Sequence, residues 1–288
     1  MPSVLTLIAQ PGALSSALIE RCRAAIDAGP ADILSPGEAA DLPCPATPSR
    51  AAIAAALDGA PVDAVLTQHA ARRKRLLIAD MDSTIVTSET LDELATFAGV
   101  GAHVAAITRR AMAGEIDFKA ALRERVALLR GLDLSALERT WQATRFTQGA
   151  RALVATMRAH GAVTALVSGG FTFFTARVAD AIGFDLHRSN VLLDDGRALL
   201  GQVQEPILDR DAKLATLHEL ATLHGLPDDA TLAVGDGAND LDMIRAAGLG
   251  VAFHAKPIVA EAAHARVDHT GLRSLLFMQG YRADEFAA

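Results

Sequence analysis

The sequence has few aromatic residues and few cysteines. Aromatic residues make up 4% of its 288 residues, with one Trp and one Tyr, so we expect no surface on which nucleic-acid bases stack. A formal net charge of −7 also argues against nucleic acid as a partner, because such binding depends on neutralising phosphates. Cys22 and Cys44 are the two cysteines. Their number and spacing predict neither a disulfide framework nor a metal site, and they suit a reducing compartment.

Long apolar runs and a basic leader are also missing. No apolar run approaches the roughly 20 residues that span a bilayer, and no basic region precedes the apolar residues near the amino terminus. We therefore expect no membrane partner and a cytoplasmic location. The basic run at residues 72–75 is interpreted as a solvated linker.

The chain divides into segments of different pattern. Its 51% hydrophobic content and mean hydropathy of +0.25 are typical of a globular protein. Residues 1–70 suggest a small α+β module. Residues 71–90 and 149–288 alternate short apolar runs with helical periodicity, which predicts an α/β core with a doubly wound parallel sheet. The intervening residues 91–148 are almost wholly helical in pattern and too long for a simple crossover, so we expect an inserted helical cap.

Two carboxylates follow the first apolar run of the predicted core. Residues 76–79 are Leu-Leu-Ile-Ala, a pattern typical of a buried parallel strand, and Asp80 and Asp82 come directly after it. Ligands of open α/β sheets bind beyond the carboxyl ends of the strands. Two carboxylates there repel each other unless a divalent cation lies between them, and oxygen ligands suit Mg²⁺. The alternative is a strand that simply ends in a polar turn.

Two further predicted strands, at residues 163–167 and 231–234, also end in polar sequences that contain glycine. The carboxyl ends of strands in one parallel sheet face the same crevice, so polar groups from all of them are expected to converge. The residues expected there are Asp80, Asp82, Ser168, Gly169, Asp236, Asn239 and Asp240.

These residue types suit phosphoryl transfer. An aspartate such as Asp80 can attack phosphorus and form an aspartyl-phosphate, while Asp82 can protonate the leaving oxygen and then activate water. A cation held by Asp80 and Asp236 offsets the repulsion between phosphate and carboxylate. Ser168 and the N–H groups after it can hold phosphate oxygens. Lys213, at the start of a predicted helix, can supply a positive charge, although a plain surface lysine would fit that position too.

In their order along the chain, these segments resemble the four motifs of the haloacid dehalogenase-like phosphatases, and the likeness covers about residues 75–288. The resemblance implies that Asp80 is the nucleophile and Asp82 the general acid/base. It implies Mg²⁺ held by the side chain of Asp80, the backbone carbonyl of Asp82 and the side chain of Asp236. Asn239 and Asp240 match positions that support the metal site, and Asn239 is also assigned to the substrate-binding set with Ser168 and Gly169. The matching segments are Asp80-Met81-Asp82-Ser83-Thr84, Ser168-Gly169-Gly170, Lys213 and Gly235-Asp236-Gly237-Ala238-Asn239-Asp240.

Within that family, the residues after the first motif are similar to those of the phosphoserine phosphatases. By this resemblance Glu89 pairs with a substrate ammonium and Arg125 with a substrate carboxylate, which a planar guanidinium binds in a bidentate manner. Met112 and Phe118 would line the cap over the substrate. Spacing alone does not choose between Arg123 and Arg125, and only the family pattern favours Arg125. The function implied is Mg²⁺-dependent hydrolysis of O-phospho-L-serine to L-serine and phosphate, the last step of serine biosynthesis.

Two other functions stay open from the sequence. One is a phosphatase or phosphotransferase for another small phosphomonoester, and the other is a non-catalytic amino-acid-sensing protein built around residues 1–70. Related enzymes often carry an ACT-like regulatory domain at that end, but this segment shows no clear effector site. It would then serve contacts within a homodimer or be a degenerate remnant. In both enzymatic readings the partner is a small-molecule substrate.

Overall fold

A six-stranded parallel sheet forms the centre of the computed structural model, which describes residues 3–112 and 115–287. The strand order is β12-β11-β10-β5-β6-β7, and each neighbouring pair is parallel. This confirms the predicted doubly wound α/β fold. The strands are β5 (Leu76–Ala79), β6 (Val163–Phe171), β7 (Leu186–Asn190), β10 (Thr231–Gly235), β11 (Leu249–Phe253) and β12 (Ala265–Val267).

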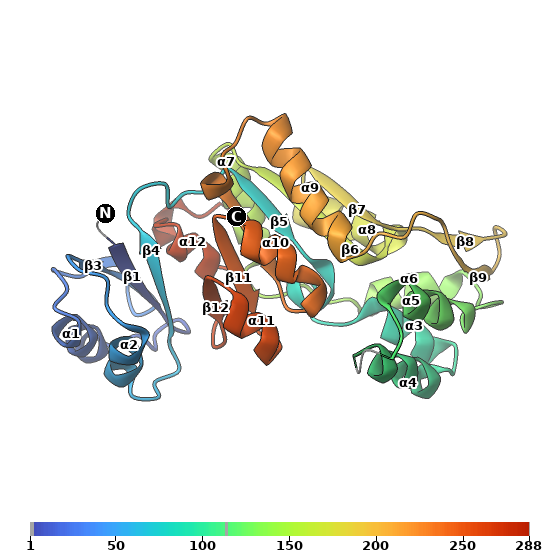
Figure 1. Ribbon diagram of the computed structural model, residues 1–288, viewed down its shortest axis with the longest axis horizontal. Coiled ribbons are helices and arrows are strands. Elements are labelled where there is room, and N and C mark those ends of the chain that lie inside the picture. Colours follow the sequence, from blue (N-terminus) through green and yellow to red (C-terminus); the bar gives the residue numbers. More distant parts are fainter. Residues whose placement is uncertain (1–2, 113–114, 288) are drawn as a thin grey trace.

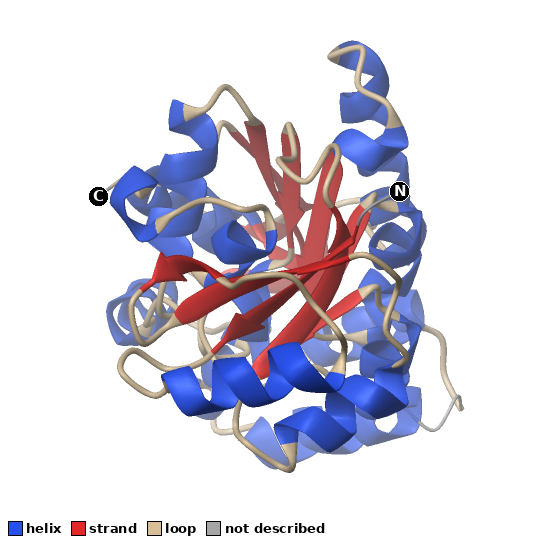
Figure 2. Ribbon diagram, turned by 90° about the vertical axis from the view of Figure 1, so that its left-hand side faces the viewer, coloured by secondary structure: helices blue, strands red, loops and turns tan. Residues whose placement is uncertain are grey.

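The sheet is covered by helices on both faces (Figure 2). Successive residues of β5 point to opposite faces, so Leu77 and Ala79 enter one apolar cluster while Leu76 and Ile78 enter another. A strand buried on both sides needs an unbroken apolar sequence, which explains why this run was recognisable. The first cluster includes residues of α7 (Ala150–Ala159), α8 (Thr172–Ile182) and α12 (Ser274–Met278), and the second includes residues of α9 (Arg210–Leu223), α10 (Leu241–Ala246) and α11 (Pro257–Ala262).

Four of the helices between β5 and β6, α3 to α6, lie at one end of the molecule together with a β-hairpin (Figure 1). The hairpin turns through residues 195–198, a stretch that contains an Asp-Gly pair, and its strand β9 packs on α5. The Gly131 N–H donates to the Leu199 carbonyl at 2.8 Å, which joins the hairpin to the helical segment by main-chain bonding. The elements are α3 (Thr90–Phe97), α4 (Gly101–Met112), α5 (Phe118–Ala127), α6 (Ser135–Ala143), β8 (Leu192–Asp194) and β9 (Leu199–Val203).

The amino-terminal module is an antiparallel sheet of order β2-β3-β1-β4 with its own apolar cluster. It is joined to the core by buried polar contacts. Arg72 Nη1 lies 2.6 Å from Asp41 Oδ2, with both side chains less than a tenth exposed, so the prediction of a solvated basic linker is wrong for Arg72. Asp63 accepts a hydrogen bond from Thr270 Oγ1 at 2.5 Å. The elements are β1 (Ser3–Ile8), α1 (Ser16–Ala25), β2 (Asp32–Ser35), β3 (Ala39–Cys44), α2 (Arg50–Leu57) and β4 (Asp63–Gln68).

Short helical turns complete the description. They are η1 (Met81–Ile85), η2 (Asp228–Ala230), η3 (Ala238–Asp240) and η4 (Ala283–Glu285). Within the described residues, no helix combines the length and apolar character that crossing a membrane requires.

Candidate active site

The site lies where three neighbouring strands end. β5 pairs with β10 on one side and with β6 on the other, so that Ala79 lies opposite both Val234 and Leu166. The residues that follow these positions leave the sheet at the same edge. The predicted convergence of the Asp80, Ser168 and Asp236 segments therefore follows directly from the strand register.

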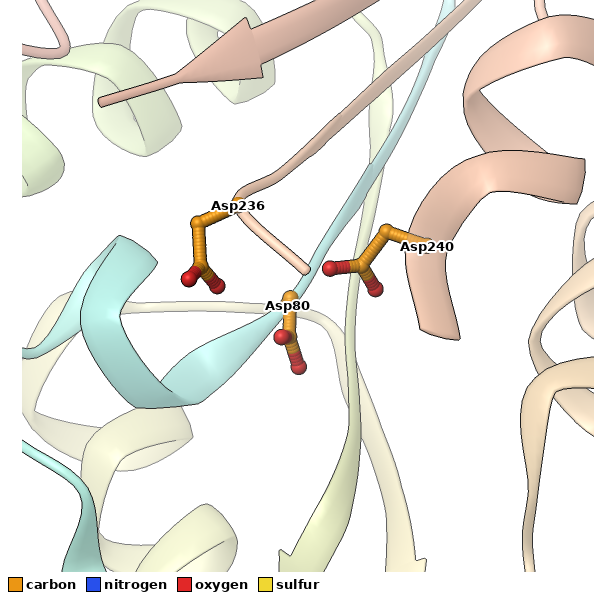
Figure 3. Close-up of side chains that lie close together, drawn as sticks. All are labelled: Asp80, Asp236 and Asp240. Atoms are coloured by element: carbon orange, nitrogen blue, oxygen red, sulfur yellow. The ribbon is translucent and has the colours of Figure 1, made fainter. Parts of the chain in front are cut away.

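Three carboxylates gather at this edge (Figure 3). Oxygen atoms of Asp80, Asp236 and Asp240 all lie within 4.8 Å of one another. Asp80 and Asp240 are buried, and a Cβ on Gly235 would collide with the Asp240 carboxyl group, so glycine is needed for this close approach. An all-oxygen set of this size and charge fits a hard divalent cation. Burial, and after it the Asp80 carboxylate, raises the pKa of Asp236 to about 6.

Lys213 is buried against two of these carboxylates. Its Nζ lies 2.7 Å from Asp80 Oδ1 and 2.6 Å from Asp240 Oδ1, and its side chain is 1% exposed. Burial alone would lower the pKa of Lys213, but the Asp240 and Asp80 carboxylates outweigh it and hold that pKa above its ordinary value. The alternative interpretation of Lys213 as a plain surface residue is therefore excluded. Helix α9, which begins at Arg210, carries it into the site.

The side chain of Asp82 connects the motif to the helix that follows it. Its Oδ1 accepts the Thr90 N–H at 3.0 Å, so Asp82 caps the amino terminus of α3. The sequence pattern instead indicates a capping box with Thr90 as the cap, but the Thr90 hydroxyl has no hydrogen-bond partner among the described residues. In the metal-free protein, burial followed by the Glu89 and Asp80 carboxylates raises the pKa of Asp82 to about 8. Asp82 can therefore carry a proton at neutral pH.

The Ser-Gly-Gly segment lies beside Asp82. Ser168 Oγ is 3.5 Å from Asp82 Oδ2 and accepts the Gly170 N–H at 2.8 Å. A Cβ on Gly170 would come within 2.8 Å of Asp82 Oδ2, so only glycine allows this approach. The segment belongs to β6, which extends to Phe171, so the predicted strand end at residue 167 is wrong by four residues. Pairing with β7 resumes at Phe171 after an irregularity.

The predicted cap, helices α3 to α6, brings Phe118 to the site, and its two candidate arginines differ in their surroundings. A Cβ on Gly169 would lie 3.1 Å from Phe118 Cζ, so the Phe118 ring contacts the Ser-Gly-Gly segment across the site. Arg123 points elsewhere, because its guanidinium pairs with Glu205 at 2.6 Å on the exposed surface. Arg125 is half-buried, and burial lowers its pKa. The carboxylates of Asp92 and Glu89 act in the other direction and offset part of this change. The structure thus separates the two arginines that spacing could not distinguish.

Glu89, Asn239 and Met112 complete the predicted set. Glu89 is exposed, accepts the Ser83 hydroxyl at 2.8 Å, and acts electrostatically on Asp82, Asp236 and Arg125. Asn239 is half-buried in η3, where a Cβ on Gly237 would meet its Oδ1. Met112 ends α4, and its side chain lies outside the described residues. Asp240, which the motif placed only in support of the metal, is the third member of the carboxylate cluster.

Comparison with known proteins agrees with this geometry. The family model described as haloacid dehalogenase-like hydrolase matches residues 77–245, more than half of the chain. The chain therefore belongs to the haloacid dehalogenase-like hydrolases. A protein named phosphoserine phosphatase from Streptococcus thermophilus is 47% identical over 186 residues, which cover 65% of this chain and 86% of that protein. A phosphoserine phosphatase from Streptomyces coelicolor is 43% identical over 244 residues, 84% of this chain and 59% of the relative.

Solved structures extend the likeness to nearly the whole chain. A haloacid dehalogenase family hydrolase from Salmonella enterica serovar Typhi superimposes with a TM-score of 0.86 at 28% identity, covering 96% of this chain and 98% of the other. A probable phosphoserine phosphatase from Vibrio cholerae, in unliganded form, gives 0.82 at 31% identity and covers 96% and 86%. Against several curated relatives the chain spans little more than half their length, 60% for the Archaeoglobus fulgidus protein and 53% for the Mycobacterium tuberculosis protein.

Proposed function

We propose that this chain hydrolyses O-phosphoserine to serine and inorganic phosphate, with Mg²⁺ as its metal. The carboxylate cluster of Asp80, Asp236 and Asp240 offers the oxygen ligands that Mg²⁺ prefers. When bound there, the ion would neutralise phosphate charge and so allow an anionic nucleophile to approach phosphorus. The family membership and the named relatives support hydrolysis of a phosphomonoester, and the cap residues support the choice of substrate.

Asp80 is the proposed nucleophile, and its hydrogen bonds distinguish its two oxygens. Both Lys213 Nζ, at 2.7 Å, and the Met81 N–H, at 2.8 Å, contact Oδ1. Among the described residues Oδ2 receives no hydrogen bond, so we assign the attack to Oδ2. The P–O bond to serine breaks as the bond from Oδ2 to phosphorus forms, which gives an aspartyl-phosphate. Lys213 balances the charge of Asp80 throughout.

Asp82 is the proposed proton carrier. With its pKa raised to about 8 in the metal-free protein, it holds a proton that it can give to the departing serine oxygen. The resulting carboxylate then takes a proton from water as that water attacks phosphorus and restores Asp80. Ser168 can hold a phosphoryl oxygen, because its Oγ accepts the Gly170 N–H and its own hydrogen, which faces Asp82 Oδ2 at a long 3.5 Å, can be donated to phosphate instead.

The observation that carries the substrate assignment is the pair of opposite charges beside this centre. Glu89 is close enough to influence both Asp82 and Asp236, and it also influences Arg125. Arg125 is half-buried and bonds only the Ala121 carbonyl, at 3.3 Å, within the described residues. A carboxylate that reached this guanidinium would satisfy it, while an ammonium would pair with Glu89. Phosphoserine carries both groups beside its phosphate.

Phosphate release from a panel of esters in Mg²⁺ tests the proposal. Phosphoserine should be preferred over phosphoethanolamine, which lacks the carboxylate, and over sugar phosphates. Arg125→Lys should raise KM for phosphoserine at least tenfold and leave phosphoethanolamine nearly unchanged, because only the first substrate has a carboxylate to lose. Arg123→Lys is the matched control and should alter neither. Equal rates on sugar phosphates and phosphoserine would refute phosphoserine as the specific substrate, and the protein would then be a phosphatase of broad specificity.

A further inference from the structure

The Ser-Gly-Gly segment is not held by the main sheet. β6 and β7 pair at Val167 with Arg188 and again at Phe171 with Asn190. Three residues of β6 therefore lie opposite the single residue Ser189. Such a bulge leaves extra residues outside the ladder and redirects them. Another contact must fix their peptide groups, because phosphate binding by backbone depends on where each N–H points.

A buried amide side chain makes that contact. Asn190 is 2% exposed. Its Nδ2 donates to the Gly169 carbonyl at 2.8 Å and to the Leu208 carbonyl at 3.2 Å, and its Oδ1 accepts the Leu208 N–H at 2.7 Å. Both amide hydrogens and the amide oxygen are thus used. The side chain joins two segments, the Ser-Gly-Gly bulge and the chain that leads into α9.

The first bond sets the orientation of the Ser168 hydroxyl. The Gly169 carbonyl and the Gly170 N–H belong to one planar peptide and point in opposite directions. When Asn190 holds the carbonyl, the N–H is directed to the other side, where it donates to Ser168 Oγ at 2.8 Å. The hydroxyl hydrogen is then directed into the site, where Asp82 Oδ2 lies 3.5 Å from Ser168 Oγ.

The second and third bonds set the position of Lys213. Leu208 directly precedes Asp209, the residue that caps α9, and Lys213 is the fourth residue of that helix. A displacement of Leu208 would therefore move the start of the helix that brings Lys213 to Asp80. The same amide fixes the phosphate segment and the origin of the lysine helix relative to each other.

We propose that Asn190 is a positioning residue for phosphoryl binding. It touches neither the carboxylate cluster nor a reacting atom, but it holds the Gly169 peptide and the Leu208 peptide at one fixed separation. The proposal rests on the proposed phosphatase function for the identity of the anion, and inorganic phosphate is its probe. Asn190 could not be identified from the sequence, because its contacts are with residues 18 to 21 positions away.

Two variants test the role. Asn190→Leu keeps the volume and shape of the side chain but removes all three hydrogen bonds, and Asn190→Ala removes the side chain as well. Ser189→Ala is the matched control on the same strand, because its hydroxyl bonds Thr172 and Thr175 and not the bulge. The readouts are the affinity for inorganic phosphate in saturating Mg²⁺, by calorimetry and by competitive inhibition, and the affinity for Mg²⁺ without phosphate.

Both Asn190 variants should bind inorganic phosphate at least tenfold more weakly, with Mg²⁺ affinity changed less than twofold. Ser189→Ala should change neither quantity. Phosphate affinity equal to wild type in a folded Asn190 variant would overturn the role, and so would a parallel loss of Mg²⁺ affinity, which would indicate general disruption of the site. A wild-type protein that binds no phosphate and releases none from phosphoserine would instead refute the proposed function.

Discussion

Replacing Lys213 by Met removes a buried cation while nearly preserving side-chain length. Lys213 Nζ contacts Asp80 Oδ1 at 2.7 Å and Asp240 Oδ1 at 2.6 Å, and all three side chains are at most 6% exposed. Without the ammonium, Asp80 and Asp240 lose the cation that they both contact, and their carboxylates face each other directly. In the folded metal-free protein, the repulsion between these carboxylates then either lowers the stability or is relieved when one of them binds a proton.

The size of the effect follows from burial. At these separations each pair is worth about 6 kcal/mol at an effective dielectric constant near 20, but burying the lysine costs several kcal/mol in lost hydration. Removal of one partner from a buried pair costs about 3–5 kcal/mol, because the remaining charges stay desolvated. We expect Lys213→Met to lower the free energy of unfolding by that amount at pH 8. The loss should be smaller at pH 6, because protons on the carboxylates replace the missing charge.

Urea unfolding in EDTA at pH 8 and pH 6 measures this change. The midpoint should fall with little change in the m-value, and Mg²⁺ should restore part of the stability at pH 8. Lys119→Met is the matched control. It breaks an exposed pair with Asp209, also 2.7 Å apart but with Lys119 45% exposed, and should therefore cost far less than Lys213→Met. Equal losses for the two variants, or a Lys213→Met loss independent of pH, would refute the reasoning.

Three further predictions concern turnover, pH and the cap. Asp80→Asn should reduce kcat at least a thousandfold while inorganic phosphate still binds, and phosphate release beside calorimetry checks this; full turnover would exclude Asp80 as nucleophile. Metal-free protein should lose stability as pH rises toward 8. The pKa of Asp82 is raised to about 8 in the folded protein, so this carboxyl binds more protons when folded than when unfolded. Its contribution to the fall in the free energy of unfolding is at most about 1.4 kcal/mol per pH unit, and less because Asp82 is half-buried. Urea midpoints measured in EDTA between pH 6 and 8 test that sign, and stability that rises with pH contradicts it. Finally, raising salt from 0.05 to 1 M should raise KM for phosphoserine about two- to threefold by screening the exposed ion pairs of Lys119 and Arg123. In steady-state kinetics, the double variant Lys119→Met, Arg123→Met should show a weaker salt dependence of KM than wild type.

The strands that could be predicted from sequence are those buried on both faces. β5, β10 and β11 are almost wholly apolar, so their sequences identify them without knowledge of their neighbours. β7 could not be recognised, because its sequence Leu-His-Arg-Ser-Asn is polar and it pairs only with β6 at the edge of the sheet. β2 and β3 lie in a stretch interrupted by glycine and proline, and only pairing identifies them, of β3 with β1 and of β2 with β3.

The candidate site divides in the same way. Asp80, Asp82 and Asp236 could be placed because each follows a recognisable strand. Spacing could not distinguish Arg125 from Arg123, since the difference between them depends on Glu205. This residue lies 82 positions from Arg123 and pairs with its guanidinium. The local pattern Thr90-x-x-Glu93 indicates a capping box in which Glu93 would accept the Thr90 N–H, but the Asp82 carboxylate accepts that N–H from outside the helix. Local rules fail where a distant or functional group competes for the same bond.

The segment 205–209 carries no motif, but it connects the cap, the phosphate segment and the lysine helix. Glu205 and Asp209 form ion pairs with Arg123 and Lys119 of α5. The Leu208 N–H donates to the Asn190 side-chain oxygen. The two kinds of contact differ in strength. Exposed ion pairs contribute about 0–1 kcal/mol each and weaken in salt, whereas buried hydrogen bonds are costly to leave unmade. Because of this difference, we expect high salt to weaken the ion pairs between α5 and this segment while the Asn190 contacts continue to hold the phosphate segment to the start of α9.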